Sequence, residues 1–465
     1  MLNPLEVPTF AVVGHPNKGK SSIVSALTQH EEVTIAPLPG TTKKHRSYAL
    51  SVDGKPLLQL VDTPGFQRPR AVMERLLTYD EATRSRRQAI ERFVAEHRDD
   101  AYFADEIELL TPIVEGAGMM YVVDASKPYA SEFETEMEIL RWCGQPSLAV
   151  INRIKDEDYT EQWREALQSH FNIVRTYDPM HATLRDHLRL IESMAHTDER
   201  WLDALKAAAS HLKEDFTRRV RASAQTIVAG LETMVRHKES MTIQKSKATP
   251  EEKETLLHRY QEALRQQERS VYKRLQAVWR HERKGIHVAL SYDDAPDLFA
   301  QESASVFGLD KKDLIVAGAL GGAASGAGID LMFVGHTLFA GGVIGALTGA
   351  AGAYLAFDRL AKISVLGIAA GRYELVMGPM KDAQFFSVAA GRLVYFAYRL
   401  ASLSHAYRDD VTIEPDEAFL QMWFDRSHTA ALTKAFAALR KGKRDDAAVG
   451  VWEKSIETMI AQAGE

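Results

Sequence analysis

The feature that most constrains this 465-residue chain is a glycine-bearing loop near its start. The loop reads Gly14-His15-Pro16-Asn17-Lys18-Gly19-Lys20-Ser21; it follows an apolar strand-like run at 8–13 and opens a helical pattern at 21–30. Gly-x4-Gly-Lys-Ser between a strand and a helix is the pattern of a phosphate-binding loop. The sequence therefore predicts an α/β domain that holds a phosphate group at this turn.

Each residue type in the loop has its own task at a phosphate. Gly14 and Gly19 let backbone N–H groups curl around a β-phosphate, and the helix N-terminus adds partial positive charge. Lys20 reaches the β- and γ-phosphates, and the Ser21 hydroxyl is offered to Mg²⁺. We therefore assign nucleotide binding in this loop to Gly14, Asn17, Lys18, Gly19, Lys20, Ser21 and Ser22, and catalysis to Lys20.

Two further patterns follow at the spacing that a nucleotide-hydrolysing switch needs. They are Pro39-Gly40-Thr41-Thr42 and Asp62-Thr63-Pro64-Gly65. Asp62, at a strand tip, can hold Mg²⁺ through a water molecule, and the Gly65 N–H can bond a γ-phosphate. Hydrolysis removes that bond, which couples the chemistry to the shape of the chain. Gly65 is therefore counted with the catalytic residues and Asp62 with the metal ligands.

The strand pattern predicts the fold of the first domain, residues 1–197. Apolar runs at 119–123 and 147–151 are typical of parallel strands buried on both faces. Asp53-Gly54 separates two other strand-like runs and predicts an antiparallel hairpin. We expect a mostly parallel sheet with one antiparallel edge strand, interrupted by a helical insertion at about 66–117.

The sequence changes character from about residue 198, where a charged, helix-favouring stretch with almost no strand pattern predicts an all-α C-terminal domain over 198–465. Gly and Ala dominate residues 314–357, and glycines recur there every fourth residue, which predicts a helical hairpin with closely packed backbones. Residues 331–357 would make about 40 Å of helix, enough for a bilayer core of roughly 30 Å. The low hydrophobicity of Gly and Ala favours a hairpin buried in protein instead. Both interpretations stay open.

Composition limits the partners and the compartment. The chain has 57 basic and 63 acidic residues, a formal net charge of −6, and no basic patch interleaved with aromatic residues, so nucleic acid is not indicated as a partner. The single cysteine, Cys143, cannot form an internal disulfide, and the N-terminus lacks a signal-peptide pattern. The cytoplasm is the expected compartment, with peripheral or inserted association with the inner membrane as the alternative.

The three motifs make the chain similar to bacterial GTPases of the Era, EngA and TrmE type over about residues 8–195. The resemblance implies GTP and GDP as ligands, with Thr42 as the switch I ligand of Mg²⁺ and a catalytic residue, and Thr41 as the less favoured choice. It also implies that Asn17 helps to hold K⁺ beside the phosphates; the alternative is that Asn17 only shapes the loop. The C-terminal part resembles helical domains of unknown function on bacterial GTPases, which implies a protein partner or a membrane surface.

The chain departs from these GTPases where they recognise the base. They read guanine with Asn-Lys-x-Asp, whereas this chain has Asn152-Arg153-Ile154-Lys155-Asp156, with Lys155 at the Asp position and Asp156 one residue late. Asn152 is in place, and Asp156 can read guanine if the loop is shifted by a residue. Otherwise discrimination against ATP weakens by about 1–3 kcal/mol.

The chain also departs at the attacking water. Phe66 follows Gly65 where Ras-like enzymes carry a water-orienting glutamine, and Gln67 lies one position late, so slow intrinsic hydrolysis is expected. Family members with this replacement obtain help from a cation, a partner or a second copy, which makes a homodimer through the G domain one option. The leading hypothesis is a GTPase switch. Its rivals are a nucleotide-binding scaffold with negligible turnover and a dynamin-like membrane-remodelling GTPase.

Overall fold

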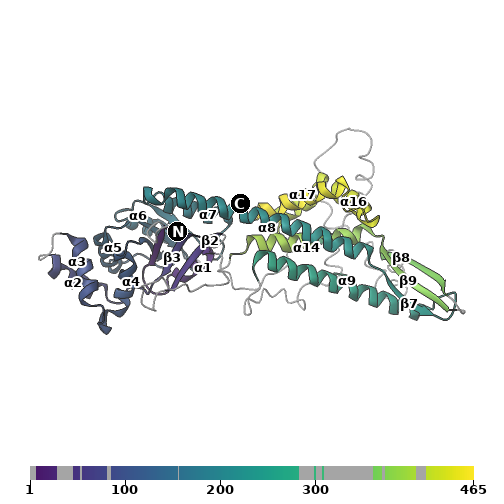
Figure 1. Ribbon diagram of the computed structural model, residues 1–465, viewed down its shortest axis with the longest axis horizontal. Coiled ribbons are helices and arrows are strands. Elements are labelled where there is room, and N and C mark those ends of the chain that lie inside the picture. The colour runs from purple at the N-terminus through teal and green to yellow at the C-terminus, as the bar shows by residue number, and fades with distance from the viewer. Residues whose placement is uncertain are drawn as a thin grey trace. The chain divides into compact units, whose positions relative to one another are not determined.

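A computed structural model of the chain is drawn in Figure 1. The structure describes residues 7–28, 46–52, 55–80, 85–154, 157–281, 298–299, 306–307, 360–368, 372–404 and 415–465. The chain divides into two compact units, Met1–Thr217 with Ser402–Arg408 and Gly464–Glu465, and Arg218–Ala401 with Asp409–Ala463. The domain boundary expected after residue 197 stays a prediction.

The first unit is built on a six-stranded sheet with the order β2-β3-β1-β4-β5-β6. Its strands are β1 (Thr9–Val13), β2 (Arg46–Val52), β3 (Lys55–Asp62), β4 (Gly118–Asp124), β5 (Ser147–Asn152) and β6 (Val174–Thr176). The edge strand β2 pairs antiparallel with β3, and all other pairs are parallel. This confirms the predicted α/β sheet with one antiparallel edge strand.

Both faces of this sheet are buried. Helices α1 (Lys20–Thr28), α5 (Glu132–Cys143), α6 (Thr160–Gln168) and α7 (Leu184–Ala195) accompany the strands. Successive side chains of a strand point to opposite faces, and in β1 Phe10 and Val12 join one hydrophobic cluster whereas Ala11 and Val13 join the other. Continuous apolar strands are therefore needed here, as the runs in the sequence indicated.

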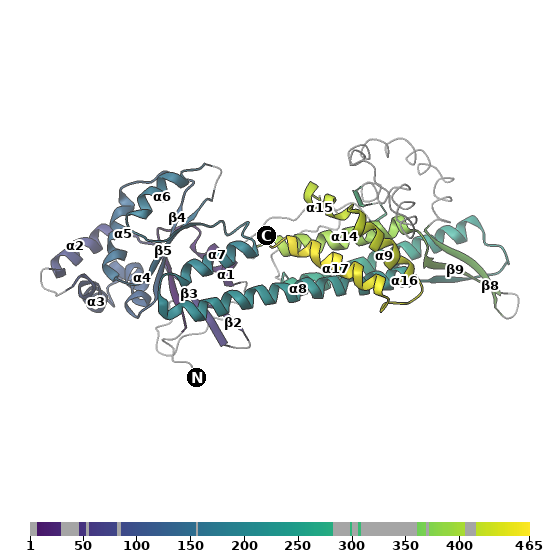
Figure 2. The ribbon, with the colours of Figure 1, turned by 90° about the horizontal axis from the view of Figure 1, so that it is seen from above.

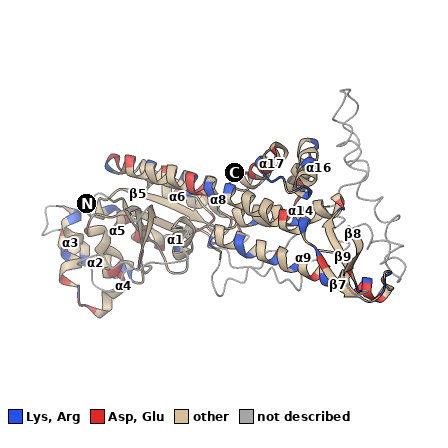
Figure 3. Ribbon diagram, turned by 45° about the vertical axis from the view of Figure 1, so that its right-hand side comes forward, with Lys and Arg blue, Asp and Glu red and all other residues tan. Residues whose placement is uncertain are grey.

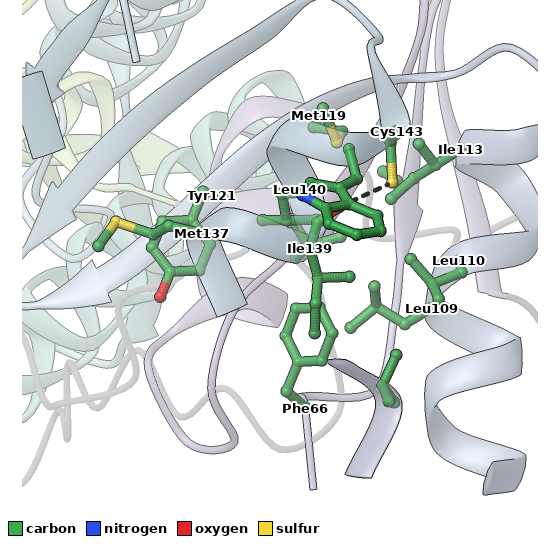
Figure 4. Packing of buried hydrophobic residues seen from close by; sticks show 14 of the residues in the cluster. Phe66, Leu109, Leu110, Ile113, Met119, Tyr121, Met137, Ile139, Leu140 and Cys143 are labelled. Carbon is green, nitrogen blue, oxygen red and sulfur yellow. Dashed lines mark hydrogen bonds between the residues drawn. The ribbon is translucent and has the colours of Figure 1, made fainter. Parts of the chain in front are cut away.

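Three helices and a short 3-10 turn stand between β3 and β4. They are α2 (Pro69–Asp80), α3 (Arg86–Glu96), η2 (Ala101–Phe103) and α4 (Ala104–Val114). We call the segment from α2 to α4, residues 69–114, the insertion. Figure 4 shows part of its core, where α4 side chains lie near Phe66 and near residues of α5. Cys143 is buried there, and burial raises the pKa of its thiol to about 12, so it acts as a packing residue.

The second unit is mainly helical. Its helices are α8 (Leu202–Arg236, which begins in the first unit), α9 (Pro250–Trp279), α14 (Ala383–Ser402), α15 (Glu417–Trp423), α16 (Arg426–Arg440) and α17 (Ala447–Gln462). Trp279 Nε1 of α9 donates to Ser223 Oγ of α8 at 2.9 Å, and Arg392 Nε of α14 donates to Glu268 Oε1 of α9 at 2.7 Å. Figure 2 shows these long helices running alongside one another. Basic and acidic residues are interspersed along α8 and α9 (Figure 3).

A three-stranded antiparallel sheet in the second unit corrects the expectation of an all-α domain. It contains β7 (Glu239–Ile243), β8 (Ala361–Ile368) and β9 (Arg372–Met380) in the order β7-β9-β8. The short, polar run of β7 becomes a strand only by pairing with β9, far along the chain. Such non-local pairing overrides local preference and leaves little trace in a local pattern.

Several expectations fall outside the described residues: the switch I residues Thr41 and Thr42, the base-loop residues Lys155 and Asp156, and the Gly/Ala-rich segment 314–357. Within the ranges that the structure does describe, no helix combines the length and the apolar character needed to cross a membrane. The two interpretations of segment 314–357 therefore stay predictions.

Candidate nucleotide-binding site

The phosphate loop lies between the end of β1 at Val13 and the start of α1 at Lys20. Its backbone adopts positive φ at Gly14 (138°), Asn17 (58°) and Gly19 (86°). Glycine accepts this region freely, and asparagine tolerates it better than most residues. A Cβ atom on Gly14 would overlap the carbonyl oxygen of Val122 in β4. The sequence of the loop is thus matched to a tight turn pressed against the sheet.

Lys20 lies over this loop. Its side chain is buried, and its Nζ donates to the carbonyl oxygens of Gly14 at 3.2 Å and His15 at 3.0 Å. Burial lowers the pKa of Lys20, and the nearby charge of Asp62 opposes that shift. A cation held in this way is directed at the loop that would surround a phosphate.

Two of the predicted metal ligands meet at the start of α1. Ser21 Oγ of α1 donates to Asp62 Oδ2, the last residue of β3, at 2.6 Å. The two residues are 41 positions apart in sequence, and the parallel pairing of β1 with β3 brings them together. A hydroxyl and a carboxylate that converge on one point suit a hard cation such as Mg²⁺.

The segment after Asp62 is fixed against the phosphate loop. Thr63 Oγ1 donates to the carbonyl oxygen of Val12 in β1 at 2.8 Å. Gly65 is buried, and a Cβ atom on it would overlap the backbone nitrogen of Pro16. Only glycine can therefore approach the loop this closely, which places the Gly65 backbone beside the phosphate-binding turn.

On the side where a base would lie, Asn152 and Lys18 hold the loop to the sheet. Asn152 Nδ2, at the end of β5, donates to the carbonyl oxygen of Lys18 at 3.1 Å. Lys18 Nζ lies 3.8 Å from Asp124 Oδ2, so this side chain is directed to β4. Burial lowers the pKa of Lys18, while the charge of Asp124 opposes the shift.

Asp124 is a site residue that the sequence analysis missed. Its Oδ1 accepts from the Ser126 N–H at 3.0 Å and from the Ile154 N–H at 3.4 Å, so it links the phosphate loop to the segment after β5. Burial by itself would raise its pKa, but the hydrogen bonds from Ser126 and Ile154 outweigh burial and lower it. A lone carboxylate at the carboxyl end of a buried parallel strand was the available signal.

Glu136 of α5 was also missed. Its carboxylate is buried, accepts from the Tyr121 hydroxyl at 3.0 Å and lies 3.0 Å from His15 Nδ1. It therefore ties the phosphate loop to α5.

Phe66, where Ras-like enzymes carry glutamine, is fully buried, whereas Gln67 is exposed. The buried, apolar side chain of Phe66 therefore cannot orient an attacking water molecule.

The fold and the phosphate loop define the first unit as a P-loop nucleotide-binding domain, and the family match below identifies it as that of a GTPase. A family model described as "50S ribosome-binding GTPase" matches residues 9–153, and one described as "Domain of unknown function (DUF3482)" matches residues 164–455. Because the second match covers more than half of the chain, the chain belongs to the DUF3482 family.

Two curated relatives each match about a third of the chain. The chain is similar to GTPase Der of Pseudothermotoga lettingae, with 27% identity over 157 residues, and to GTPase Der of Burkholderia mallei, with 28% identity over 153 residues. Each match covers 33% of this chain and 30% or 28% of the relative, respectively, so the chain spans less than a third of their length. A solved structure of Aquifex aeolicus Era bound to GDP.AlF4- shares 15% identity, covering 51% of this chain and 72% of that chain. Its TM-score of 0.25 adds nothing to the assignment.

Proposed function

We propose that this GTPase is a switch: it binds GTP with Mg²⁺, hydrolyses it slowly and passes the nucleotide state to its helical C-terminal domain. The observation that carries the proposal is the convergence of Ser21 and Asp62 at 2.6 Å beside a glycine, Gly65, that abuts the phosphate loop. A γ-phosphate can reach both the metal site and the switch backbone from that position. Loss of the γ-phosphate would then release the segment after Gly65.

Nucleotide binding is assigned to the phosphate loop and to the base side. The loop supplies Gly14, Asn17, Lys18, Gly19, Lys20, Ser21 and Ser22, and the base side supplies Asn152 and Asp156. Lys18 contributes through its backbone, because its side chain pairs with Asp124. Asn152 acts by holding the loop, because its amide donates to the Lys18 carbonyl oxygen.

Mg²⁺ would be held by Ser21, Asp62 and Thr42. The described part of this donor set fits, since a hydroxyl and a carboxylate oxygen are ligands that Mg²⁺ prefers. The ion would neutralise charge that develops on the phosphates. K⁺ is the proposed second ion, beside Asn17, which lies in the phosphate loop with a positive φ.

Slow turnover follows from the side chains around Gly65. Lys20 supplies positive charge, and the Gly65 N–H supplies a donor to the γ-phosphate, but the next side chain, Phe66, is buried in the hydrophobic core. A missing charge-stabilising group such as an arginine finger costs about 10³- to 10⁵-fold in rate in related chemistry. A partner protein, a second copy of the G domain or K⁺ would supply the help.

The test is multiple-turnover phosphate release from GTP by the full chain, with and without Mg²⁺, and with Lys20→Ala as the inactive control. We expect slow, Mg²⁺-dependent release that the variant loses. No release above the variant's rate would leave a nucleotide-binding scaffold. Sedimentation with liposomes in GDP and GTP-analogue states tests the membrane alternative, and a protein that ignores liposomes in both states would remove it.

A further inference from the structure

A buried carboxylate of the insertion holds the backbone directly after Gly65. Glu106 Oε1 of α4 accepts from the Gln67 N–H at 2.9 Å and from the Arg68 N–H at 2.6 Å. Those amides lie two and three residues after the glycine that abuts the phosphate loop. The contact is thus between the nucleotide switch and a residue that lies 38 and 39 positions further along the chain than Arg68 and Gln67.

The Glu106 side chain is expensive to bury. It is 0% exposed, and within the described part of the chain its second oxygen, Oε2, has no hydrogen-bond partner. Glutamate is almost never fully buried unless its charge is paired, because burial removes the hydration of the carboxylate and this costs free energy. Among the residues that the structure describes, Glu106 accepts hydrogen bonds from the two switch amides alone. That arrangement indicates a role at the switch backbone rather than in packing.

The neighbouring residues fasten the same segment to the insertion. Phe66 is fully buried and lies near Leu109 of α4, as Figure 4 shows. Arg68 Nη1 donates to the Tyr102 carbonyl oxygen at 3.0 Å, and the guanidinium lies 4.6 Å from the centre of the Tyr102 ring. Three successive residues after Gly65 are therefore bound to the insertion. A displacement of Gly65 by the nucleotide would act on α4 through all three.

We propose that Glu106 is a positioning residue of the GTPase site. It fixes the backbone at Gln67 and Arg68 so that the Gly65 N–H stays directed at the γ-phosphate, and it makes the insertion the first element to respond to the nucleotide. The proposal rests on the proposed switch function. The competing interpretation is that Glu106 only caps the N-terminus of α2, which begins at Pro69.

The first test compares affinities of the full chain for GDP and for a non-hydrolysable GTP analogue. Glu106→Ala should weaken analogue binding about tenfold while GDP binding changes less than about twofold, because only the analogue uses the Gly65 N–H. Ile113→Ala is the matched control. It removes a fully buried side chain from the same helix, and Figure 4 shows it beside Cys143, away from Phe66. An equal loss for both nucleotides, or the same selectivity in the control, would overturn the proposal.

The second variant is Glu106→Gln, which keeps an oxygen that can accept both amides but loses the charge. It keeps the proposal testable if Glu106→Ala fails to fold, and we expect it to show a smaller loss of analogue affinity than Glu106→Ala. Hydrogen exchange of a peptide that contains Gln67 and Arg68 should be slowed by the analogue in wild type and in Ile113→Ala. That protection should shrink in Glu106→Gln. Unchanged protection and unchanged affinity in Glu106→Gln would contradict the proposal.

These measurements also separate the two levels of the argument. If wild-type protein neither hydrolyses GTP nor protects the segment after Gly65 when the analogue binds, the switch function itself fails and the role of Glu106 fails with it. If wild type does both and the Glu106 variants behave like Ile113→Ala, the switch function stands. Only the assignment of Glu106 is then wrong.

Discussion

The phosphate side and the base side of the nucleotide site differ in how closely their residues are held together. On the phosphate side, the loop, α1 and the end of β3 converge, with Ser21 and Asp62 joined at 2.6 Å and Lys20 within 3.2 Å of two loop carbonyl oxygens. On the base side, Arg153, where related GTPases carry lysine, forms an ion pair with Asp158 at 2.9 Å, and both side chains are about half exposed. Exposed pairs of this kind contribute only about 0–1 kcal/mol.

The difference indicates where this chain obtains its affinity. In the proposed site, backbone amides, a buried lysine and a metal ion would act on the phosphates, which every nucleoside triphosphate shares. Discrimination between bases needs a carboxylate held at the guanine edge, and the residue at the usual position is Lys155. We therefore expect strong binding through the phosphates and a modest preference for guanine. The predictions below test this contrast, beginning with the largest effect.

Removal of the phosphate-side cation should have the largest effect. Lys20→Ala deletes a buried ammonium from the loop, and losing one partner of a buried charged contact costs about 2–5 kcal/mol. GDP affinity should fall at least about thirtyfold, as measured by fluorescence titration or calorimetry. Lys213→Ala, which changes an exposed lysine of α8, is the control. Near wild-type GDP affinity in Lys20→Ala would sink the assignment of the phosphate site.

The metal ligands should come next. Asp62→Ala removes the oxygen that accepts from Ser21 Oγ, and Thr42→Ala removes the expected switch I ligand. Loss of a group that holds a metal through water or through another ligand typically lowers metal affinity or activity about 10- to 100-fold. We expect that loss in Mg²⁺-dependent hydrolysis, with GDP binding affected less. Equal turnover in wild type and both variants would remove the proposed mechanism.

The parts of the site that could be predicted are motifs, and the residues within each motif are close in sequence. The phosphate loop and the Asp62–Gly65 motif are each a single continuous stretch of sequence. The Asp53-Gly54 pair lies between β2 and β3, where a hairpin was predicted. The positions of α1, β4 and β5 likewise follow from local periodicity. Local chemistry thus predicted the sheet of the first unit, while the assignment of the phosphate-side residues stays a prediction.

The parts that were missed depend on contacts between distant residues. β7 is defined by its pairing with β9, and Asp124 acts on Lys18 and Ile154. Glu106 did leave a trace in the sequence, because it shares a helical face with Leu109, Leu110 and Ile113 at positions i, i+3, i+4 and i+7. A glutamate on an otherwise apolar stripe marks a buried carboxylate. Its partners, however, could not be read from the stripe.

The effect on the base side comes next, because it changes the ratio of GTP to ATP affinity and leaves the phosphate contacts in place. If Asp156 reads guanine from its shifted position, Asp156→Ala should reduce the preference for GTP over ATP by about 1–3 kcal/mol, or roughly 5- to 150-fold. Thermal shifts against GTP, GDP, ATP and ADP measure this preference, and Lys155→Ala is the neighbouring control. A wild-type protein that binds ATP as well as GTP would contradict guanine reading by Asp156.

The smallest effect concerns the monovalent cation. If Asn17 helps to hold K⁺, replacing K⁺ by Na⁺ should slow hydrolysis severalfold, and a variant without the side-chain amide should lose that difference while keeping nucleotide affinity. Alanine is a poor choice for this variant, because Asn17 has φ of 58° and the left-handed region costs a residue with a Cβ atom roughly 1–2 kcal/mol. A slower Asn17→Ala protein would mix backbone strain with loss of the ion.

Asn17→Gly avoids that strain, because glycine occupies positive φ freely. We expect it to bind GDP like wild type and to hydrolyse GTP at a single slow rate in both K⁺ and Na⁺. Asn17→Ala should show the same indifference to the cation with an added loss of affinity, and the difference between the two variants then measures the strain. A wild-type rate that is equal in K⁺ and Na⁺, or a K⁺ effect that survives in Asn17→Gly, would leave Asn17 as a residue that shapes the loop. The slow hydrolysis of GTP would then depend on the protein's own groups and Mg²⁺, without a contribution from K⁺.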